Sequence, residues 1–210
     1  MTAIRGLVET VIDDERMDAE TQKRFLIKAR NQTDRLAALV SDLLNLGRLE
    51  SDAASMEKHP FDLRKSVEES LSGMKTLAAE AEVCLKMEAP DSPVMVLGDE
   101  EAIRVVVDNL LSNAIRYTPK GGLASVRVSD TPDGPLLEVS DTGIGIAPKH
   151  QSRIFERFYR VDKARSRELG GTGLGLSIVK HIVNAHGGQL ALQSALGQGS
   201  VFTARFPKAG

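Results

Sequence analysis

Two glycine-rich segments, one of them headed by a carboxylate, have the residue types and spacing to hold a nucleotide. The first segment begins at Asp141, directly after the mainly apolar residues 136–140, and continues with Gly143 and Gly145. The apolar run predicts a buried strand ending at a turn, and the glycines let the backbone turn sharply and a flat ligand come close. This segment is therefore expected to form one end of a ligand site.

The second segment carries its glycines at the predicted start of a helix. A helix start offers free N–H groups and the positive end of the helix dipole, and both favour an anion such as phosphate. The carboxylate and the helix start are thus expected to hold the two ends of one nucleotide. The glycines are Gly170, Gly171, Gly173 and Gly175, and the apolar positions at helical spacing are Leu174, Ile178, Val179, Ile182 and Val183.

A predicted helix ending at Tyr117 carries polar residues that core packing does not require. Asn109 and Asn113 lie four residues apart, hence on one face, among apolar neighbours. An amide oxygen is a reasonable neutral ligand for Mg²⁺, which keeps waters and shares phosphate oxygens. Arg116 offers a cation for phosphate and Tyr117 a ring that could cover a base. The alternative is that both asparagines are buried amides that bond to the backbone.

Other nucleotide motifs do not fit these glycines. The chain has no G-x-x-x-x-G-K-[ST] segment, and Gly171, Gly173 and Gly175 step by two rather than in the dinucleotide-binding pattern. The charged residues 160–169 before them are predicted to form a mobile lid over the phosphates. The alternative for that interval is an ordinary solvated loop.

Composition excludes several classes of protein. The 210 residues include 27 basic and 29 acidic side chains, a formal charge of −2, which gives no electrostatic case for nucleic acid. The single cysteine, Cys84, cannot form an internal disulfide, and its apolar neighbours predict a small core residue. There is neither an apolar run of about 20 residues nor a signal pattern. The chain as given is expected to be cytoplasmic, without membrane contact, although a longer parent could be anchored in the cell membrane.

The N-terminal residues 1–52 are predicted to form a helical hairpin. Apolar residues recur at helical spacing over 2–16 and again over 19–49, and the second stripe is broad. A long helix with so broad an apolar face is expected to need more than one partner helix, as in a dimer that forms a four-helix bundle. The alternative is a single long helix lying on its own globular domain.

Residues 53–210 alternate between helix and strand patterns. They predict a mixed sheet with helices on one face, an α+β sandwich. Asp62 and Asp99 are predicted helix N-caps, and Pro132-Asp133-Gly134 a hairpin turn. The expected helices are 62–80 and 99–117 besides the one after the glycines; the expected strands are 83–87, 94–97, 125–129, 136–140, 189–194 and 200–206.

Four segments together resemble a known family. DNLLSNAIRYTPKGG, DTGIGIAP, IFERFYR and GGTGLGLSIVK are similar, in order and spacing, to the N, G1, F and G2 boxes of bacterial sensor histidine kinases. The helical hairpin resembles their dimerisation and phosphotransfer domain. The resemblance implies a Bergerat-type (GHKL) ATP-binding fold over 53–210, with ATP and Mg²⁺ as cofactors and a response regulator as partner.

The resemblance also implies roles for particular residues. Asn113 would hold Mg²⁺, Asp141 would accept a hydrogen bond from the adenine amino group, and Tyr117 would pack on the ring. Arg116 and Arg160 would approach the phosphates as the catalytic cations. The remaining ATP-binding positions implied are Asn109, Gly143, Gly145, Ile146, Phe155, Phe158, Gly171, Thr172, Gly173, Leu174, Gly175 and Leu176. Of these, Phe155 and Phe158 would anchor the base of the lid.

One position bears on the choice between phosphate transfer and hydrolysis. Hydrolysing relatives of this fold resemble one another in a Glu placed four residues before the magnesium Asn. Here that position is Asn109, which cannot act as a general base. The sequence therefore favours a kinase over the two alternatives, a stand-alone GHKL-type ATPase and a non-catalytic module that dimerises or binds a regulator.

The front of the chain departs from the family. Members carry a box resembling H-E-x-x-T-P on the first hairpin helix, whereas this chain starts at Met1-Thr2-Ala3-Ile4, which matches only the end of that box. None of the four histidines (His59, His150, His181 and His186) is followed by an acid. The hairpin is therefore expected to be truncated after the acceptor, the homodimer weakened and self-phosphorylation of this chain absent.

Overall fold

The computed structural model describes residues 2–14, 16–51, 58–161 and 171–208. The chain divides into two compact units. Residues 1–47 belong to the first unit, and residues 48–161 and 173–210 form the second. Each unit is described by itself.

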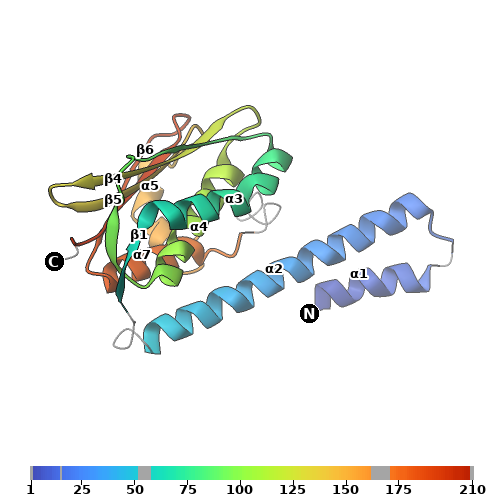
Figure 1. Cartoon of the computed structure of the whole chain (residues 1–210). Helices are drawn as coiled ribbons and strands as arrows, with labels where there is room; N and C mark the ends of the chain where they lie inside the picture. Colours follow the sequence, from blue (N-terminus) through green and yellow to red (C-terminus); the bar gives the residue numbers. More distant parts are fainter. Residues whose placement is uncertain (1, 15, 52–57, 162–170, 209–210) are drawn as a thin grey trace. The chain divides into compact units, whose positions relative to one another are not determined.

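The first unit contains the predicted pair of helices. Helix α1 spans Thr2–Asp13 and α2 spans Ala19–Ser51 (Figure 1). Helix α1 ends at Asp13 rather than at Arg16 as expected, and Met17 N then donates to Asp14 O at 3.1 Å. Asp18 Oδ1 then accepts from Thr21 N at 2.8 Å and so caps the start of α2.

Much of the apolar stripe on α2 is exposed to solvent. Side chains that would be core residues in a helical bundle are 40–50% exposed: Leu26, Ile27, Leu36, Val40 and Leu43. An exposed stripe of this kind is the surface that a partner helix would cover. No helix in the described part of the chain has the length and apolar character needed to span a membrane.

The second unit is built on a five-stranded mixed sheet in the order β2-β4-β5-β7-β6. Strand β2 runs parallel to β4, and the other neighbours are antiparallel. The strands are β2 Cys84–Glu88, β4 Leu123–Thr131, β5 Gly134–Asp141, β6 Gln189–Ser194 and β7 Ser200–Arg205. The predicted mixed sheet is confirmed, and so is the predicted hairpin turn at Pro132-Asp133-Gly134, which joins β4 to β5.

Three helices pack on one face of this sheet: α3 Leu63–Ala81, α4 Glu100–Tyr117 and α7 Gly175–Ala185 (Figure 1). Helix α4 contacts both α3 and α7 and also β4 and β5, so it is the centre of the core. Side chains alternate across a strand, so every second sheet residue joins this core while the others face solvent. The buried sheet residues include Ala124, Val126, Val128, Leu137, Val139, Phe202 and Ala204.

Both predicted aspartate caps are present. Asp99 Oδ1 accepts from Ala102 N at 3.0 Å and begins α4. Asp62 begins α3, and its carboxylate also accepts from Val94 N (3.1 Å) and from the Arg64 side chain (2.7 Å). The hydrogen bonds from Arg64 hold the pKa of Asp62 below its usual range.

Short elements follow β5: helix α5 Pro148–Gln151 and a 3₁₀ turn, η1, Arg153–Phe155.

Two features differ from the expectations. Strand β1, His59–Asp62, pairs with β3, Met95–Gly98, in a separate two-stranded sheet. Strand β1 was not among the expected strands, because a strand of four residues containing Pro60 carries little local signal. Cys84 is exposed, so its assignment to the core was wrong: it begins the edge strand β2 with its side chain on the solvent side.

A buried histidine joins the end of α7 to the start of α4. His186 is 3% exposed, and its Nε2 accepts from Asp99 N at 3.0 Å. The proton must therefore lie on Nδ1, which donates to Ile182 O at 2.8 Å. Burial lowers the pKa of His186. Gly98 is needed beside the ring, since a Cβ there would lie 2.8 Å from His186 Cδ2.

The stability of the second unit is expected to fall when the pH is lowered below about 6.5, the ordinary pKa of histidine. In that window the unfolded chain binds a proton that native His186 does not, so the free energy of unfolding decreases by up to ~1.4 kcal/mol per pH unit. Urea unfolding between pH 7 and pH 5 measures it. In His186→Gln the contribution of His186 to the slope of unfolding free energy against pH should disappear. The other histidines contribute the same slope in both proteins. Equal slopes in the two proteins would contradict the assignment.

Candidate nucleotide-binding site

Asp141 lies where the sequence places it, at the end of a central strand. It is the last residue of β5, directly opposite Ser200, the first residue of β7. Its Oδ1 accepts from Gly143 N at 2.7 Å. Burial raises the pKa of Asp141, and backbone hydrogen bonds from Gly143 and Ser200 offset part of that effect. The result is a partly desolvated carboxylate that can still accept a hydrogen bond from a ligand.

The glycines after Asp141 are required by close backbone contacts. A Cβ on Gly143 would lie 2.5 Å from Tyr117 O, the same carbonyl that accepts from Ile144 N at 3.2 Å. Gly145 has φ +67°, and a Cβ there would lie 1.9 Å from Ala195 O. The loop therefore lies between the end of α4 and the turn that joins β6 to β7.

That turn contains site residues that the sequence reasoning missed. Gly199 has φ +81°, and a Cβ there would lie 1.9 Å from Asp141 O. Ser200 is 6% exposed and stands beside Asp141 in the register of β5 and β7. Residues 196–199, between the expected strands 189–194 and 200–206, were not among the predicted site residues. A glycine directly before a strand was the available signal, but its neighbour across the sheet is 58 positions away in the chain.

The two asparagines of α4 have different environments. Asn109 Nδ2 donates to Val105 O at 2.8 Å, so the backbone-bonding alternative holds for this amide nitrogen. Its Oδ1 abuts the start of α7, because a Cβ on Gly175 would lie 2.3 Å from it. Asn113 is half-buried, and no described residue hydrogen-bonds to its side chain. Asn113 is therefore the amide with unused capacity for a ligand.

The start of α7 presents a helix N-terminus within the second glycine-rich segment. The helix begins at Gly175, and no side chain caps it from Leu174, which is fully buried. Gly173 has φ +79°, and its carbonyl accepts from Phe158 N at 2.8 Å. Gly175 and the half-buried Leu176 follow within the first turn. The orphan N–H groups of this turn can therefore face phosphate.

The two phenylalanines of the F segment behave differently. Phe155 is half-buried and meets Phe202 edge-on, with ring centroids 6.5 Å apart. Phe158 is 58% exposed with φ +61°, so its backbone rather than its ring makes the contact with Gly173. Both precede the segment 160–169 expected to be a lid, of which residues 162–169 lie outside the described residues.

The other residues predicted to bind ATP are half-buried. Arg116 and Tyr117 form the end of α4 and are half-buried, as are Ile146 and Arg160. Gly171 and Thr172 are half-buried and precede the second segment of this unit, which begins at Gly173. In the described part of the chain no group of three or more His, Cys, Asp and Glu could hold a metal ion.

The histidines have structural surroundings. His59 is exposed at the start of β1 and lies 6.3 Å from Phe61, between ring centroids. His150 in α5 is bonded through Nδ1 to Tyr159 OH at 2.7 Å. His186 bridges two helices, and His181 is half-buried within α7.

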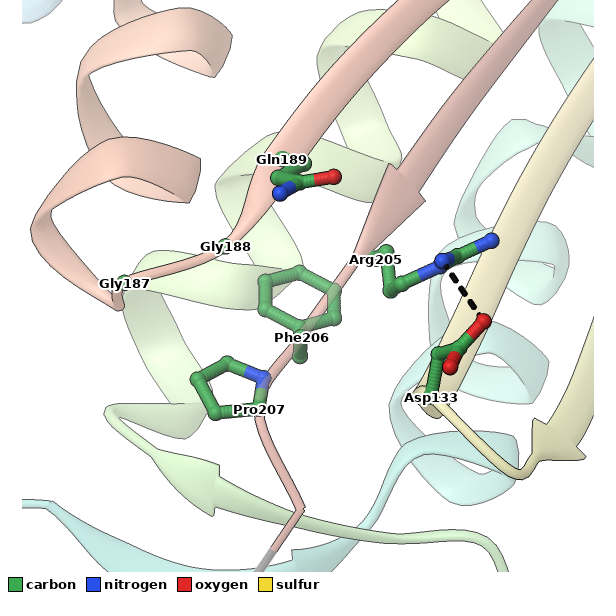
Figure 2. Close-up of a pocket in the computed structure, with 7 residues that line it drawn as sticks. All are labelled: Asp133, Gly187, Gly188, Gln189, Arg205, Phe206 and Pro207. Carbon is green, nitrogen blue, oxygen red and sulfur yellow. Dashed lines mark hydrogen bonds and ion pairs between the residues drawn. The ribbon is translucent and has the colours of Figure 1, made fainter.

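A groove at the other end of the sheet is a weaker candidate for a ligand. Asp133 and Arg205 line it, with Arg205 Nη1 donating to Asp133 Oδ2 at 3.1 Å (Figure 2). Asp133 precedes the first residue of β5 and Asp141 is its last, so the groove is about 25 Å from the glycine loops. Its charged side chains already pair with each other. The groove is lined by Asp133, Gly187, Gly188, Gln189, Arg205, Phe206 and Pro207.

Comparison with known families assigns both parts of the chain. Residues 98–210 match the family model described as histidine kinase-, DNA gyrase B-, and HSP90-like ATPase. Residues 1–52 match the model of the His Kinase A (phospho-acceptor) domain. The first match alone covers more than half of the chain.

Curated relatives and solved structures agree. The chain is 41% identical over 190 residues to the sensor-like histidine kinase SenX3 of Mycobacterium tuberculosis, covering 90% of this chain and 46% of that protein. It is 36% identical over 209 residues to the phosphate regulon sensor protein PhoR of Pseudomonas aeruginosa, covering 100% of this chain and 47% of that one. The chain thus spans about half the length of these relatives.

Two solved structures show the same fold over the whole chain. The Acinetobacter baumannii histidine kinase AdeS matches with a TM-score of 0.76 and 26% identity, covering 100% of this chain and 95% of that one. Full-length ShkA, solved in complex with AMPPNP, matches with a TM-score of 0.75 and 28% identity, covering 100% and 44%. With these matches, the chain belongs to the bacterial sensor histidine kinases, and its second unit has their ATPase fold.

Proposed function

We propose that the second unit binds Mg²⁺ and ATP and holds the γ-phosphate for transfer to a histidine, from which it passes to a response regulator. One observation carries the proposal: the loop after Asp141 and the start of α7 both contact the same helix, α4. Ile144 N reaches Tyr117 O, and Gly175 packs against Asn109 Oδ1. A carboxylate for a base and a helix start for phosphate therefore both lie against the C-terminal half of α4, which supports the proposal.

The base end of the nucleotide would lie at Asp141. This carboxylate, partly desolvated and bonded to Gly143 N, would accept from the exocyclic amino group of adenine. Gly143 and Gly145 would let the ring approach the backbone, and Tyr117 would cover it. The AMPPNP bound to the similar kinase ShkA supports an adenine nucleotide as the ligand.

The phosphate end would lie between α4 and α7. Asn113, whose side chain bonds to no described residue, fits one coordination position of Mg²⁺, with phosphate oxygens and waters supplying the others. Bound there, Mg²⁺ would neutralise charge on the phosphates. Arg116 would approach the phosphates from the last turn of α4, and Arg160 from the start of the lid segment. Gly171 and Thr172 would complete the lid hinge before Gly173.

Transfer is favoured over hydrolysis because no carboxylate stands where water would be activated. Asn109 donates its amide to Val105 O and packs its oxygen against Gly175, so it is a helix contact and cannot take a proton. The acceptor would be a histidine on a phosphotransfer hairpin, not any of the four in this chain. The exposed stripe of α2, including Leu36 and Val40, would form the homodimer contact.

The proposed transfer is tested by supplying an acceptor on a separate chain. The chain is incubated with γ-labelled ATP and a hairpin fragment of the same family that carries a complete acceptor box. Label that is acid-labile and base-stable is expected on the fragment and absent from this chain. Rapid release of phosphate to water in the absence of the fragment would instead favour a stand-alone ATPase.

Asn113→Ala is the variant that tests the site. Losing one polar contact should weaken magnesium-dependent ATP binding by about 1–3 kcal/mol and reduce label transfer. Ser112→Ala is the matched control, since Ser112 is on the same helix turn and its hydroxyl donates to a backbone carbonyl, Asn109 O, at 3.2 Å. Isothermal calorimetry showing equal affinity for ATP with Mg²⁺ in Asn113→Ala and the wild type would remove Asn113 from the site.

A further inference from the structure

The hydroxyl of Ser194 stands at a junction of three backbone segments near Asp141. Ser194 is the last residue of β6, and its Oγ accepts from Ile146 N at 2.8 Å. The same hydroxyl donates to Gly199 O at 2.8 Å and lies 3.0 Å from Ser200 Oγ. A serine hydroxyl has one proton and two lone pairs, so these three bonds use all of its capacity. Since its proton goes to Gly199 O, the proton between the two serines belongs to Ser200.

Gln151 completes the junction from α5. Its Nε2 donates to Ile146 O at 2.9 Å and to Ser194 O at 2.8 Å. Both backbone groups of Ile146 are therefore bound by two side chains from elsewhere in the fold. The glycine loop, the end of β6 and the start of β7 are held together by one serine and one glutamine.

This junction determines which hydrogen-bonding groups the base end of the site presents to a ligand. Ser200 lies directly opposite Asp141 in the sheet. Because its proton is directed to Ser194, the hydroxyl of Ser200 faces its surroundings as an acceptor only. The Asp141 carboxylate is also an acceptor. Two acceptors side by side match the amino group of adenine and oppose the carbonyl of guanine at the same position.

We propose that Ser194, supported by Gln151, is the positioning residue for base selection in this site. It fixes the distance between Ile146 and Gly199 and keeps Ser200 as an acceptor beside Asp141. The proposal rests on the proposed ATP-binding function.

The test compares nucleotide selectivity with stability. Calorimetry measures the affinities for ATP and GTP with Mg²⁺, and thermal unfolding measures stability. Ser194→Ala should weaken ATP binding about tenfold and narrow the preference for ATP over GTP, because Ser200 is then free to donate. Ser194→Thr, which keeps the hydroxyl, should restore the preference.

The control removes an equivalent pair elsewhere in the same sheet. Ser125 Oγ lies 2.7 Å from Ser140 Oγ on the face opposite the helices. Ser125→Ala should leave the ratio of ATP to GTP affinity as in the wild type, even if the melting temperature drops. An equal loss of selectivity in Ser125→Ala and Ser194→Ala would overturn the role of Ser194.

A second variant keeps the proposal testable if Ser194→Ala does not fold. Gln151→Glu replaces two donated bonds by repulsion from Ile146 O and Ser194 O and should also weaken ATP binding. Gln193→Glu controls for the added charge, because Gln193 is an exposed residue of β6 next to Ser194. A wild-type chain that binds no ATP overturns the proposed function and the role of Ser194 together. Wild-type binding with unchanged affinity and selectivity in Ser194→Ala or Gln151→Glu overturns the role of Ser194 alone.

Discussion

Gly199→Ala is expected to destabilise the second unit by about 3 kcal/mol or more and to abolish ATP binding. Two effects add. A residue other than glycine at φ +81° costs about 1–2 kcal/mol, and the new Cβ would lie 1.9 Å from Asp141 O. The contact is with backbone, so neither strand can relieve it by a rotamer change. Any relief would move Asp141 itself and with it the base end of the site.

Gly197→Ala is the matched control for this variant. Gly197 lies in the same turn with φ +78°, but a Cβ there meets nothing within 4 Å. In Gly197→Ala the free energy of unfolding should fall only by the conformational cost of a non-glycine residue at this φ, about 1–2 kcal/mol, and the variant should still bind ATP. Urea unfolding and calorimetry on both variants separate the backbone strain from the collision. Equal stabilities and equal ATP affinities in the two variants would show that Gly199 and Asp141 do not approach each other in this way.

Asp141→Asn is expected to lose ATP affinity while stabilising the chain in the absence of nucleotide. The amide can keep the bond from Gly143 N, but a hydrogen bond from the ligand to a charged acceptor is lost, which costs about 1.5–3 kcal/mol. This corresponds to a weakening of roughly 10- to 150-fold. Calorimetry with ATP measures the loss, and Asp130→Asn, an exposed position on β4, controls for the change in charge.

The gain in stability follows from the sign of the pKa shift. Burial raises the pKa of Asp141 above its value in the unfolded chain, so the charged carboxylate disfavours the folded state at neutral pH. Removing the charge removes that cost. As the pH falls through the native pKa, the native wild type takes up a proton and the difference between the two proteins begins to shrink; below the unfolded value of about 3.8 it should have vanished. A variant that unfolds more easily than the wild type at pH 7 would contradict this account.

The elements of the second unit were largely predictable because their signals are local. Asp62 and Asp99 cap helices through bonds to residues two or three positions away, so the sequence pattern contains both partners. Alternation of buried and exposed residues in β4 and the helical spacing in α7 also depend only on neighbours. The segments that carry Asp141, Asn113 and Gly175 were recognised for the same reason.

Features decided by contacts between distant segments could not be read from local patterns. Strand β1 exists because Phe61 pairs with Val96, and Cys84 faces solvent because β2 is an edge strand. The free energy of such pairing comes from residues far away in the chain, so the local pattern does not contain it.

The candidate site depends both on local sequence patterns and on contacts between distant segments. Residue types alone suggested that Asn109 and Asn113 could be equivalent, yet one bonds to Val105 O and packs on Gly175 while the other bonds to no described residue. The difference comes from where along α4 the start of α7 lies, because the two asparagines share a face but are one helical turn apart and Gly175 meets only the first of them. Likewise, no motif marks Ser194 as a partner of Ile146, 48 positions earlier, because a single hydroxyl has no local pattern. Only the packing of β6 beside the glycine loop brings them within hydrogen-bonding distance.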